Sequence, residues 1–128
     1  MMDLSELGNY QCSDWVDYPI TIRGATGGLL GTSPIICGGG GLPITDKCYV
    51  INKKKAKLVG KMSTKRYLAA SVTINDTLLW VSGGKYDKYN DNTLSSSEFF
   101  HLENGTMPGP ELPLPLQYHA MIMIASCY

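Results

Sequence analysis

The chain has few charged residues and no net charge. Of its 128 residues, 17% are Asp, Glu, Lys or Arg, and 11 basic side chains balance 11 acidic ones. Nucleic acids and anionic membranes usually select for a basic protein surface, so this balance gives no electrostatic reason to expect either as a partner. The one basic cluster, residues 52–61, is most simply a solvated turn with its neighbouring strand, and a phosphate-binding patch is the alternative.

Long hydrophobic runs are also absent. No stretch approaches the roughly 18 apolar residues that a membrane-spanning helix needs. The N-terminal sequence MMDLSELGNYQ is acidic and lacks the apolar segment of a secretory signal. We therefore expect no membrane partner and no signal peptide in this sequence.

The four cysteines form no C-x-x-C pair. Cys12, Cys37, Cys48 and Cys127 are separated by 25, 11 and 79 positions. These spacings point neither to a zinc site nor to a redox dithiol.

No window of about 11 residues has the 3.6-residue period of an amphipathic helix. Short apolar runs with β-branched or aromatic residues recur instead, and glycine, proline or asparagine separates them. These runs are PITIRG, PIIC, KCYVIN, AKLVGKM, LAASVTI, TLLWVS, SSEFFHL and YHAMIMI. The chain is therefore predicted to be nearly all β, and the bulky residues Trp80, Phe99 and Phe100 are predicted to fill its core.

Two of these strands end in a diglycine, and the two diglycines are 45 positions apart. The first, PIICGG, ends at Gly39, and the second, LLWVSGG, ends at Gly84. An aromatic strand, a leucine and a Tyr-x-Ala strand follow each of them. One repeating unit is thus strand, turn, strand ending in Gly-Gly, longer loop, strand, short turn and strand.

These residues resemble the kelch-repeat family of β-propellers. The segments that carry the resemblance are LLWVSGG, SSEFF and LVGKMSTKRYLAASV, over about residues 24–124. The resemblance implies an all-β fold, a partial kelch-type β-propeller of four-stranded antiparallel blades. It also implies that four glycines are structural strand ends, namely Gly38, Gly39, Gly83 and Gly84.

Under this interpretation, residues 1–23 hold an N-terminal segment and the last strand of a preceding blade. Residues 24–66 and 67–116 are the two repeats, and residues 117–128 begin the next blade. The usual outer-strand tryptophan is missing from both units, and Gln117 stands where Arg66 stood. A propeller needs about five to seven blades, so we expect the remaining blades in a longer chain, or a truncated product whose exposed edges favour aggregation.

Comparison of the two units also places two cysteines at matching positions. Cys37 precedes its diglycine as Ser82 does, and Cys48 begins the next strand near the place of Ser97. A hairpin of antiparallel strands would bring the two cysteines side by side, where a disulfide is feasible. The alternative is two reduced, buried cysteines, as in a cytosolic protein.

Two N-glycosylation sequons are present, Asn75-Asp76-Thr77 and Asn104-Gly105-Thr106. Both fall in predicted turns on the propeller face opposite to the longer loops. With the disulfide, the two sequons favour an extracellular location.

Several motifs resemble known sites but lack required residues. After the glycines of residues 38–41 come Leu42 and Pro43, whereas a phosphate-binding P-loop needs Lys followed by Ser or Thr. Residues 87–98 depart from a calcium loop at their third and sixth positions. His101 and His119 have no nucleophile nearby in sequence. We therefore expect no catalytic, cofactor-binding or metal-binding residues.

The remaining hypothesis is protein binding. In kelch proteins, loops gathered on one propeller face commonly engage partner proteins, and here these would be residues 40–46, 63–67, 85–93 and 113–118. The loop that follows Gly84 mixes tyrosines with charges and amides, a composition that suits recognition. Its candidate contact residues are Lys85, Tyr86, Asp87, Lys88, Tyr89, Asn90 and Asp91. We expect a non-enzymatic protein-interaction scaffold with an unknown protein partner; the alternative is a fragment of a kelch-fold enzyme such as a secreted copper-dependent oxidase.

Overall fold

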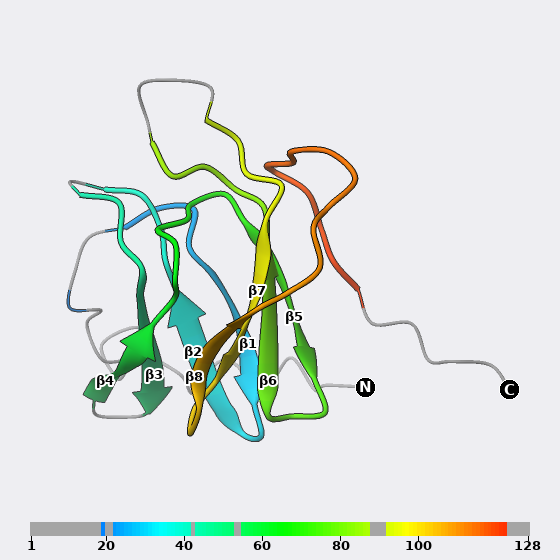
Figure 1. Cartoon of the computed structure of the whole chain (residues 1–128). Helices are drawn as coiled ribbons and strands as arrows, with labels where there is room; N and C mark the ends of the chain where they lie inside the picture. The colour runs from blue at the N-terminus through cyan, green and yellow to red at the C-terminus, as the bar shows by residue number, and fades with distance from the viewer. Residues whose placement is uncertain (1–18, 20–21, 42, 53–54, 88–91, 123–128) are drawn as a thin grey trace, which may run out of the picture.

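The computed structural model describes residues 19, 22–41, 43–52, 55–87 and 92–122. Within these residues the chain forms eight β-strands and no helix. The strands are β1 (Thr26–Leu30), β2 (Ser33–Cys37), β3 (Lys47–Asn52), β4 (Lys55–Lys61), β5 (Ala70–Ile74), β6 (Leu78–Ser82), β7 (Ser97–His101) and β8 (Gly105–Pro108). Consecutive strands pair into two antiparallel four-stranded sheets, β1-β2-β3-β4 and β5-β6-β7-β8 (Figure 1). The all-β prediction is confirmed.

Connections of two kinds alternate along the chain and lie at opposite ends of the sheets (Figure 1). Short hairpin turns join β1 to β2, β5 to β6 and β7 to β8 at the lower end in the figure. In the β5–β6 turn, Asn75 and Asp76 have φ angles of 51° and 59°, a left-handed conformation that Asn and Asp tolerate better than other side chains do. The longer connections all lie at the upper end.

The core lies between the two sheets, and both sheets contribute to it. Its buried residues are Leu30, Ile35, Cys37, Cys48, Met62, Leu79, Val81 and Phe100. The inner strands β1 and β5 approach closely, because a Cβ added at Gly28 would lie 2.5 Å from Oγ1 of Thr73. At the same contact, the Ser71 hydroxyl donates a hydrogen bond to the Gly27 carbonyl over 2.9 Å. Small residues on the inner strands therefore set the distance between the sheets.

The prediction that three aromatic residues fill the core holds for one of them. Phe100 is fully buried between the sheets. Trp80 and Phe99 instead lie on the opposite face of the second sheet, half-buried and stacked with ring centroids 5.8 Å apart. Alternation along β6 explains this, because its neighbours Leu79 and Val81 point into the core.

Two expected strands do not form in the described residues. In the segment PITIRG, the structure shows only an isolated bridge between Arg23 and Gly40. The segment YHAMIMI is not extended into a strand over residues 118–122, and residues 123 and 124 lie outside the described part. An inner strand needs a second strand of its own blade as a hydrogen-bonding neighbour, and the described residues supply none for residues 118–122. No helix in the described part of the chain is long and apolar enough to span a membrane.

Candidate interaction face

The described parts of four long connections gather on one surface, which we call the loop face: residues 38–41, 43–46, 62–69, 83–87, 92–96 and 109–117 (Figure 1). The opposite surface, the hairpin face, holds the turns at residues 31–32, 75–77 and 102–104. The described residues of the predicted partner-binding loop, Lys85, Tyr86 and Asp87, lie on the loop face, and both sequons lie on the hairpin face.

Each diglycine anchors the loop face to the end of its sheet. The amide of Gly39 donates to the Arg66 carbonyl, and that of Gly84 to the Leu116 carbonyl, each over 2.8 Å. The preceding glycines, Gly38 and Gly83, have φ angles of 66° and 63°. A Cβ at Gly38 would collide with the Arg66 carbonyl, and a Cβ at Gly83 would collide with the Leu116 carbonyl. Only glycine therefore fits both the backbone conformation and the available space.

The two crossover segments, 62–69 and 109–122, repeat the same backbone path where each passes its diglycine. The amide of Leu68 donates to the Gly24 carbonyl over 2.8 Å, and the amide of Tyr118 donates to the Leu68 carbonyl over 3.1 Å. Gly24, Leu68 and Tyr118 all have positive φ. The second crossover therefore begins along the same backbone path as the first. The first crossover leads into β5, whereas no strand follows the second in the described residues.

This hydrogen-bond pattern corrects one equivalence inferred from sequence. Because Leu116 accepts from Gly84 as Arg66 accepts from Gly39, Leu116 takes the place of Arg66, and Gln117 lies one residue further on. The alignment error came from matching the two Tyr-x-Ala segments, which are shifted by one residue relative to the backbone.

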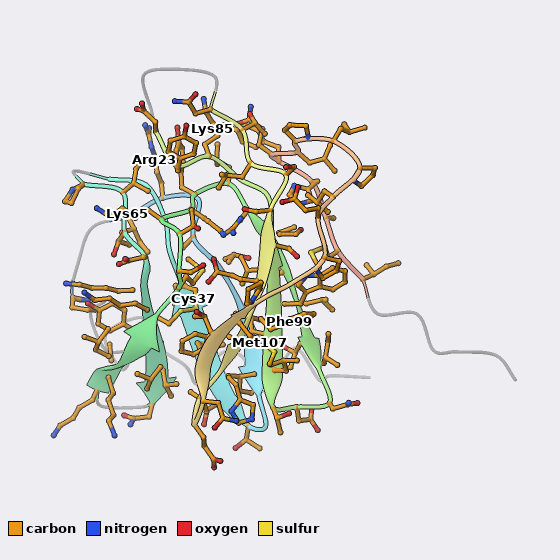
Figure 2. The ribbon with its side chains drawn as sticks, viewed as in Figure 1. Arg23, Cys37, Lys65, Lys85, Phe99 and Met107 are labelled. Atoms are coloured by element: carbon orange, nitrogen blue, oxygen red, sulfur yellow. A yellow bond between two sulfur atoms is a disulfide. The ribbon has the colours of Figure 1, made fainter. Side chains whose placement is uncertain are left out.

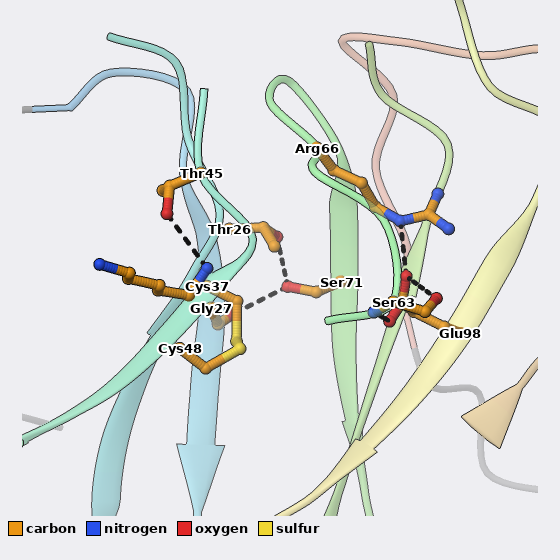
Figure 3. Close-up of a disulfide and its surroundings, with 10 residues drawn as sticks. Thr26, Gly27, Cys37, Thr45, Cys48, Ser63, Arg66, Ser71 and Glu98 are labelled. Atoms are coloured by element: carbon orange, nitrogen blue, oxygen red, sulfur yellow. Dashed lines mark hydrogen bonds and ion pairs between the residues drawn. A yellow bond between two sulfur atoms is a disulfide. The ribbon is translucent and has the colours of Figure 1, made fainter. Parts of the chain in front are cut away.

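The first crossover carries a buried ion pair that sequence analysis did not predict. Arg66 and Glu98 are 2% and 1% exposed, and Nε of Arg66 lies 3.0 Å from Oε2 of Glu98 (Figure 3). The remaining guanidinium nitrogens donate to the carbonyls of Gly83 and Ser96 and to the Ser96 hydroxyl. Glu98 also accepts from the amide and hydroxyl of Ser63. The pair thus ties the crossover to β7 and to the second diglycine.

A signal for this pair was present in the sequence. Both residues stand in the segments that carry the family resemblance, Arg66 in KMSTKRYL and Glu98 in SSEFF. Their sequence separation of 32 positions gives no indication that they meet, because only the packing of the first crossover against the second sheet brings them together.

The disulfide between Cys37 and Cys48 is confirmed. The two residues are directly paired across β2 and β3, with Cα atoms 4.1 Å apart, and both are fully buried (Figure 3). The bridge closes the base of the 38–46 loop, where the Gly38 amide also donates to the Lys47 carbonyl.

In the second sheet, Ser82 and Ser97 occupy the positions of the two cysteines and are likewise paired in register. The Ser82 hydroxyl lies 2.9 Å from Nε2 of His119 and donates to Sδ of Met121. Burial lowers the pKa of His119, and the backbone of Ser82 partly opposes this effect. The imidazole is therefore largely neutral at pH 7.

This Ser–His contact does not make a nucleophile. Ser82 is fully buried and directs its hydroxyl hydrogen toward a thioether. Nδ1 of His119 has no hydrogen-bond partner in the described part of the chain, so no carboxylate orients the ring as a catalytic triad requires. The contact instead fastens the second crossover to its sheet.

The predicted partner-binding loop is held at its stem. The backbone of Lys85 exchanges hydrogen bonds with Tyr67, and the Leu94 amide donates to the Gly84 carbonyl. Tyr86 is 48% exposed, and the Asn92 amide group donates to Asp87 over 3.4 Å. Four of the candidate residues, Lys88, Tyr89, Asn90 and Asp91, lie outside the described residues.

Three basic residues lie at the same end of the molecule as this stem. Arg23 precedes β1, Lys65 is in the first crossover and Lys85 follows the second diglycine, and Figure 2 shows all three toward the upper end. Arg23 and Lys65 are exposed, and Lys85 is half-buried.

Comparison with known proteins adds a structural relative. No family model and no curated protein matches the chain. A fungal alcohol oxidase of the AA5 family, solved in complex with copper, matches with a TM-score of 0.63 and 15% sequence identity. The match covers 73% of this chain and 23% of that chain, so this chain corresponds to about a quarter of the oxidase. The likeness shows the fold, a partial, propeller-like arrangement of four-stranded antiparallel sheets.

The described residues do not fit a copper site. In this part of the chain, no three His, Cys, Asp or Glu side chains come together to hold a metal ion. His101 lies on the hairpin face, where its Nδ1 accepts from the Glu103 amide, whereas His119 contacts Ser82 near the loop face. Cys37 and Cys48 are joined to each other.

Proposed function

We propose that the chain is a segment of a kelch-type propeller that binds a protein partner through its loop face and has no catalytic role. The observation that carries this proposal is the construction of the 85–93 loop. Its stem is fixed by backbone hydrogen bonds to Tyr67 and Gly84, while Tyr86 remains half exposed. A fixed stem lowers the entropy that binding costs, and an exposed tyrosine supplies contact area with few rotatable bonds.

The cations of the loop face indicate the chemistry of the partner. Arg23, Lys65 and Lys85 would be attracted by acidic side chains, and such attraction chiefly raises the association rate. A partner with an acidic surface is therefore preferred over a neutral one, and its binding should weaken as salt rises.

The test is capture of a partner from the native source, followed by binding measurements with purified components. The double variant Tyr86→Ala/Lys85→Ala should lower the affinity at least about tenfold, as expected for loss of an anchoring side chain and a cation. Leu102→Ala is the matched control, because Leu102 is 40% exposed on the hairpin face. Equal binding by the double variant and the control would overturn the proposal.

A second candidate is a segment of a kelch-fold copper oxidase, and the AA5 relative is the observation in its favour. Because the described residues hold no ligand cluster, the copper ligands would have to come from residues elsewhere in the protein. Copper analysis of the purified protein, with an assay for oxidation of alcohols, distinguishes the two functions. Stoichiometric copper with alcohol-dependent oxygen consumption would establish the second candidate and overturn the first.

We also propose that another blade packs on the outer face of the second sheet. On this face Met107 is 55% exposed beside the stacked Trp80 and Phe99, and Trp80 Nε1 is buried with no partner among the described residues (Figure 2). The second crossover, which repeats the first, leads the chain toward this face. Met107→Lys should reduce concentration-dependent self-association, measured by light scattering, while Leu102→Lys, at an exposed residue of the β7–β8 turn, should leave it unchanged. Equal self-association of the two variants would contradict this packing.

A further inference from the structure

The two sequons lie close together on the hairpin face of the second sheet. Asn75 is in the β5–β6 turn and Asn104 is in the β7–β8 turn, and both side chains are exposed. The intervening strands β6 and β7 are direct neighbours, with Leu78 paired to His101 next to the two turns. Two independent motifs therefore present their asparagines at the same end of one sheet.

Both side-chain amides are free to be modified. In the described part of the chain, neither amide takes part in a hydrogen bond, and the turns are closed by backbone contacts such as the Thr77 amide with the Ile74 carbonyl. The adjacent residues Asp76 and Glu103 are also exposed. A sugar on either Nδ2 would therefore extend into solvent without displacing any contact of the fold.

The disulfide supplies an independent argument about compartment. Cys37 and Cys48 are bonded to each other in the core between the sheets. Structural disulfides form in the secretory compartments and are rare in the reducing cytosol. A chain that acquires this bond during folding is thus exposed to the enzymes that attach N-linked sugars in the same compartment.

We propose that Asn75 and Asn104 both accept N-linked oligosaccharides when the protein folds in the secretory pathway. In the transfer, Nδ2 of each asparagine attacks the anomeric carbon of a lipid-diphosphate-linked oligosaccharide. An N–C bond forms, the bond from that carbon to the diphosphate oxygen breaks, the lipid diphosphate leaves with the electron pair, and the amide loses one proton. The threonine two residues later, Thr77 or Thr106, is the part of the motif that the transferase requires.

Glycans at these positions would cover one face and leave the other open. Leu102, which is 40% exposed beside Asn104, would be shielded from solvent and from other proteins. The loop face, at the opposite end of the sheets, would remain accessible (Figure 1). This inference does not depend on the proposed function, because it holds for an oxidase segment as well.

The test is expression of the full chain behind a secretory leader in cultured eukaryotic cells. The secreted protein should lose mass on treatment with peptide N-glycosidase F, and peptide mapping should find aspartate in place of asparagine at positions 75 and 104. Thr77→Val and Thr106→Val should each remove one glycan, and the double variant both. Thr77→Ser and Thr106→Ser, which preserve the motif, should restore them, so misfolding cannot imitate the result.

A matched control lies at the same end of the molecule. Asn52→Gln alters an exposed asparagine at the end of β3 that belongs to no sequon, and it should leave the mass shift unchanged. No mass shift in secreted wild-type protein, or a shift that persists in the double valine variant, would overturn the inference. Occupancy of one asparagine alone would overturn it for the other.

Discussion

The two four-stranded sheets differ most where their second and third strands reach the loop face. In the first sheet, the paired residues Cys37 and Cys48 are joined covalently. In the second sheet, Ser82 and Ser97 occupy the same positions, and Ser82 bonds to His119 and Met121 of the following crossover instead. At this position the first sheet is therefore linked between two of its own strands, β2 and β3, while the second sheet is linked through Ser82 to the segment that follows β8.

The two crossovers also differ, and here it is the first one whose side chain makes additional contacts with the second sheet. In the first, the side chain of Arg66 reaches Glu98 and the carbonyls of Gly83 and Ser96. In the second, Leu116 takes the place of Arg66 and offers only its backbone carbonyl to Gly84. The backbone hydrogen bonds between each diglycine and its crossover are alike in the two sheets. The disulfide, the Arg66–Glu98 pair and the Ser82–His119 contact are therefore additions to a backbone arrangement that both sheets share.

The largest loss of stability is expected from Arg66→Leu, which gives the first crossover the residue that the second crossover has at the equivalent position. Arg66→Leu removes the guanidinium and leaves Glu98 buried and without its counter-ion, and loss of one partner of a buried pair costs about 3–5 kcal/mol. The free energy of unfolding in urea measures the loss. The double variant Arg66→Leu/Glu98→Gln should recover part of it, because Gln carries no charge and still accepts from Ser63. A loss below about 1 kcal/mol in the single variant would show that the pair contributes little.

The next largest effect should come from giving the first sheet the serines of the second. Cys37→Ser/Cys48→Ser should lower the free energy of unfolding by about 2–4 kcal/mol, because the disulfide no longer restricts the unfolded chain. The new hydroxyls would also lack a partner equivalent to His119, since Ala69 occupies its position in the first crossover, one residue after the positive-φ residue Leu68. Chemical denaturation of the variant and of the reduced wild-type protein should give similar values. Wild-type stability in the variant would contradict this account.

A smaller effect tests the framework that the two junctions share. Gly38→Ala and Gly83→Ala should destabilise to a similar degree, because each new Cβ meets a crossover carbonyl. Gly31→Ala is the matched control, since Gly31 also has a positive φ, 65°, but has nothing within 4 Å of the added Cβ. We expect each diglycine variant to exceed the control by about 1–3 kcal/mol, the usual cost of overpacking. If all three variants lose the same amount, only the backbone conformation matters.

The smallest effect concerns the contact that only the second sheet has. Because burial lowers the pKa of His119 below its ordinary value of 6.5, the unfolded chain binds more protons than the folded chain as pH falls through 6.5. The contribution of His119 to the free energy of unfolding is therefore fully present above about pH 6.5 and declines as the pH falls below that value. Urea denaturation between about pH 5 and pH 8 should show this slope in wild type and a weaker one in His119→Gln. The opposite sign of the difference would contradict the placement of His119.

Sequence patterns predicted the strands well where a segment has both the residue types of a strand and a neighbouring strand to pair with. Alternation and β-branched or aromatic residues marked β2, β3, β6 and β7, and the diglycine repeat placed the ends of β2 and β6. β8, Gly105–Pro108, has little β propensity of its own and is a strand because it pairs with β7. The segment of residues 118–122 has the composition of a strand but no neighbour to pair with in the described residues.

The contents of the loop face were predicted only in part. The repeat comparison found the disulfide, because two residues at matching strand ends are direct neighbours in any antiparallel pair. The Arg66–Glu98 pair and the Ser82–His119 contact depend instead on packing between a crossover and a sheet, which no periodicity in one strand reports. The same limit explains the one-residue error at Gln117, since backbone hydrogen bonds rather than residue identity determine which positions correspond.

The disulfide also determines what a protease could release from this protein. Pro43 is exposed in the 38–46 loop between the two bridged strands, and a cut beside it would separate the chain into two pieces that remain joined through Cys37 and Cys48. β1 and β2 would stay attached to β3, and the nick would become visible only after reduction. A cut in the 83–96 loop has no such safeguard, because Ser82 and Ser97 are held by hydrogen bonds alone.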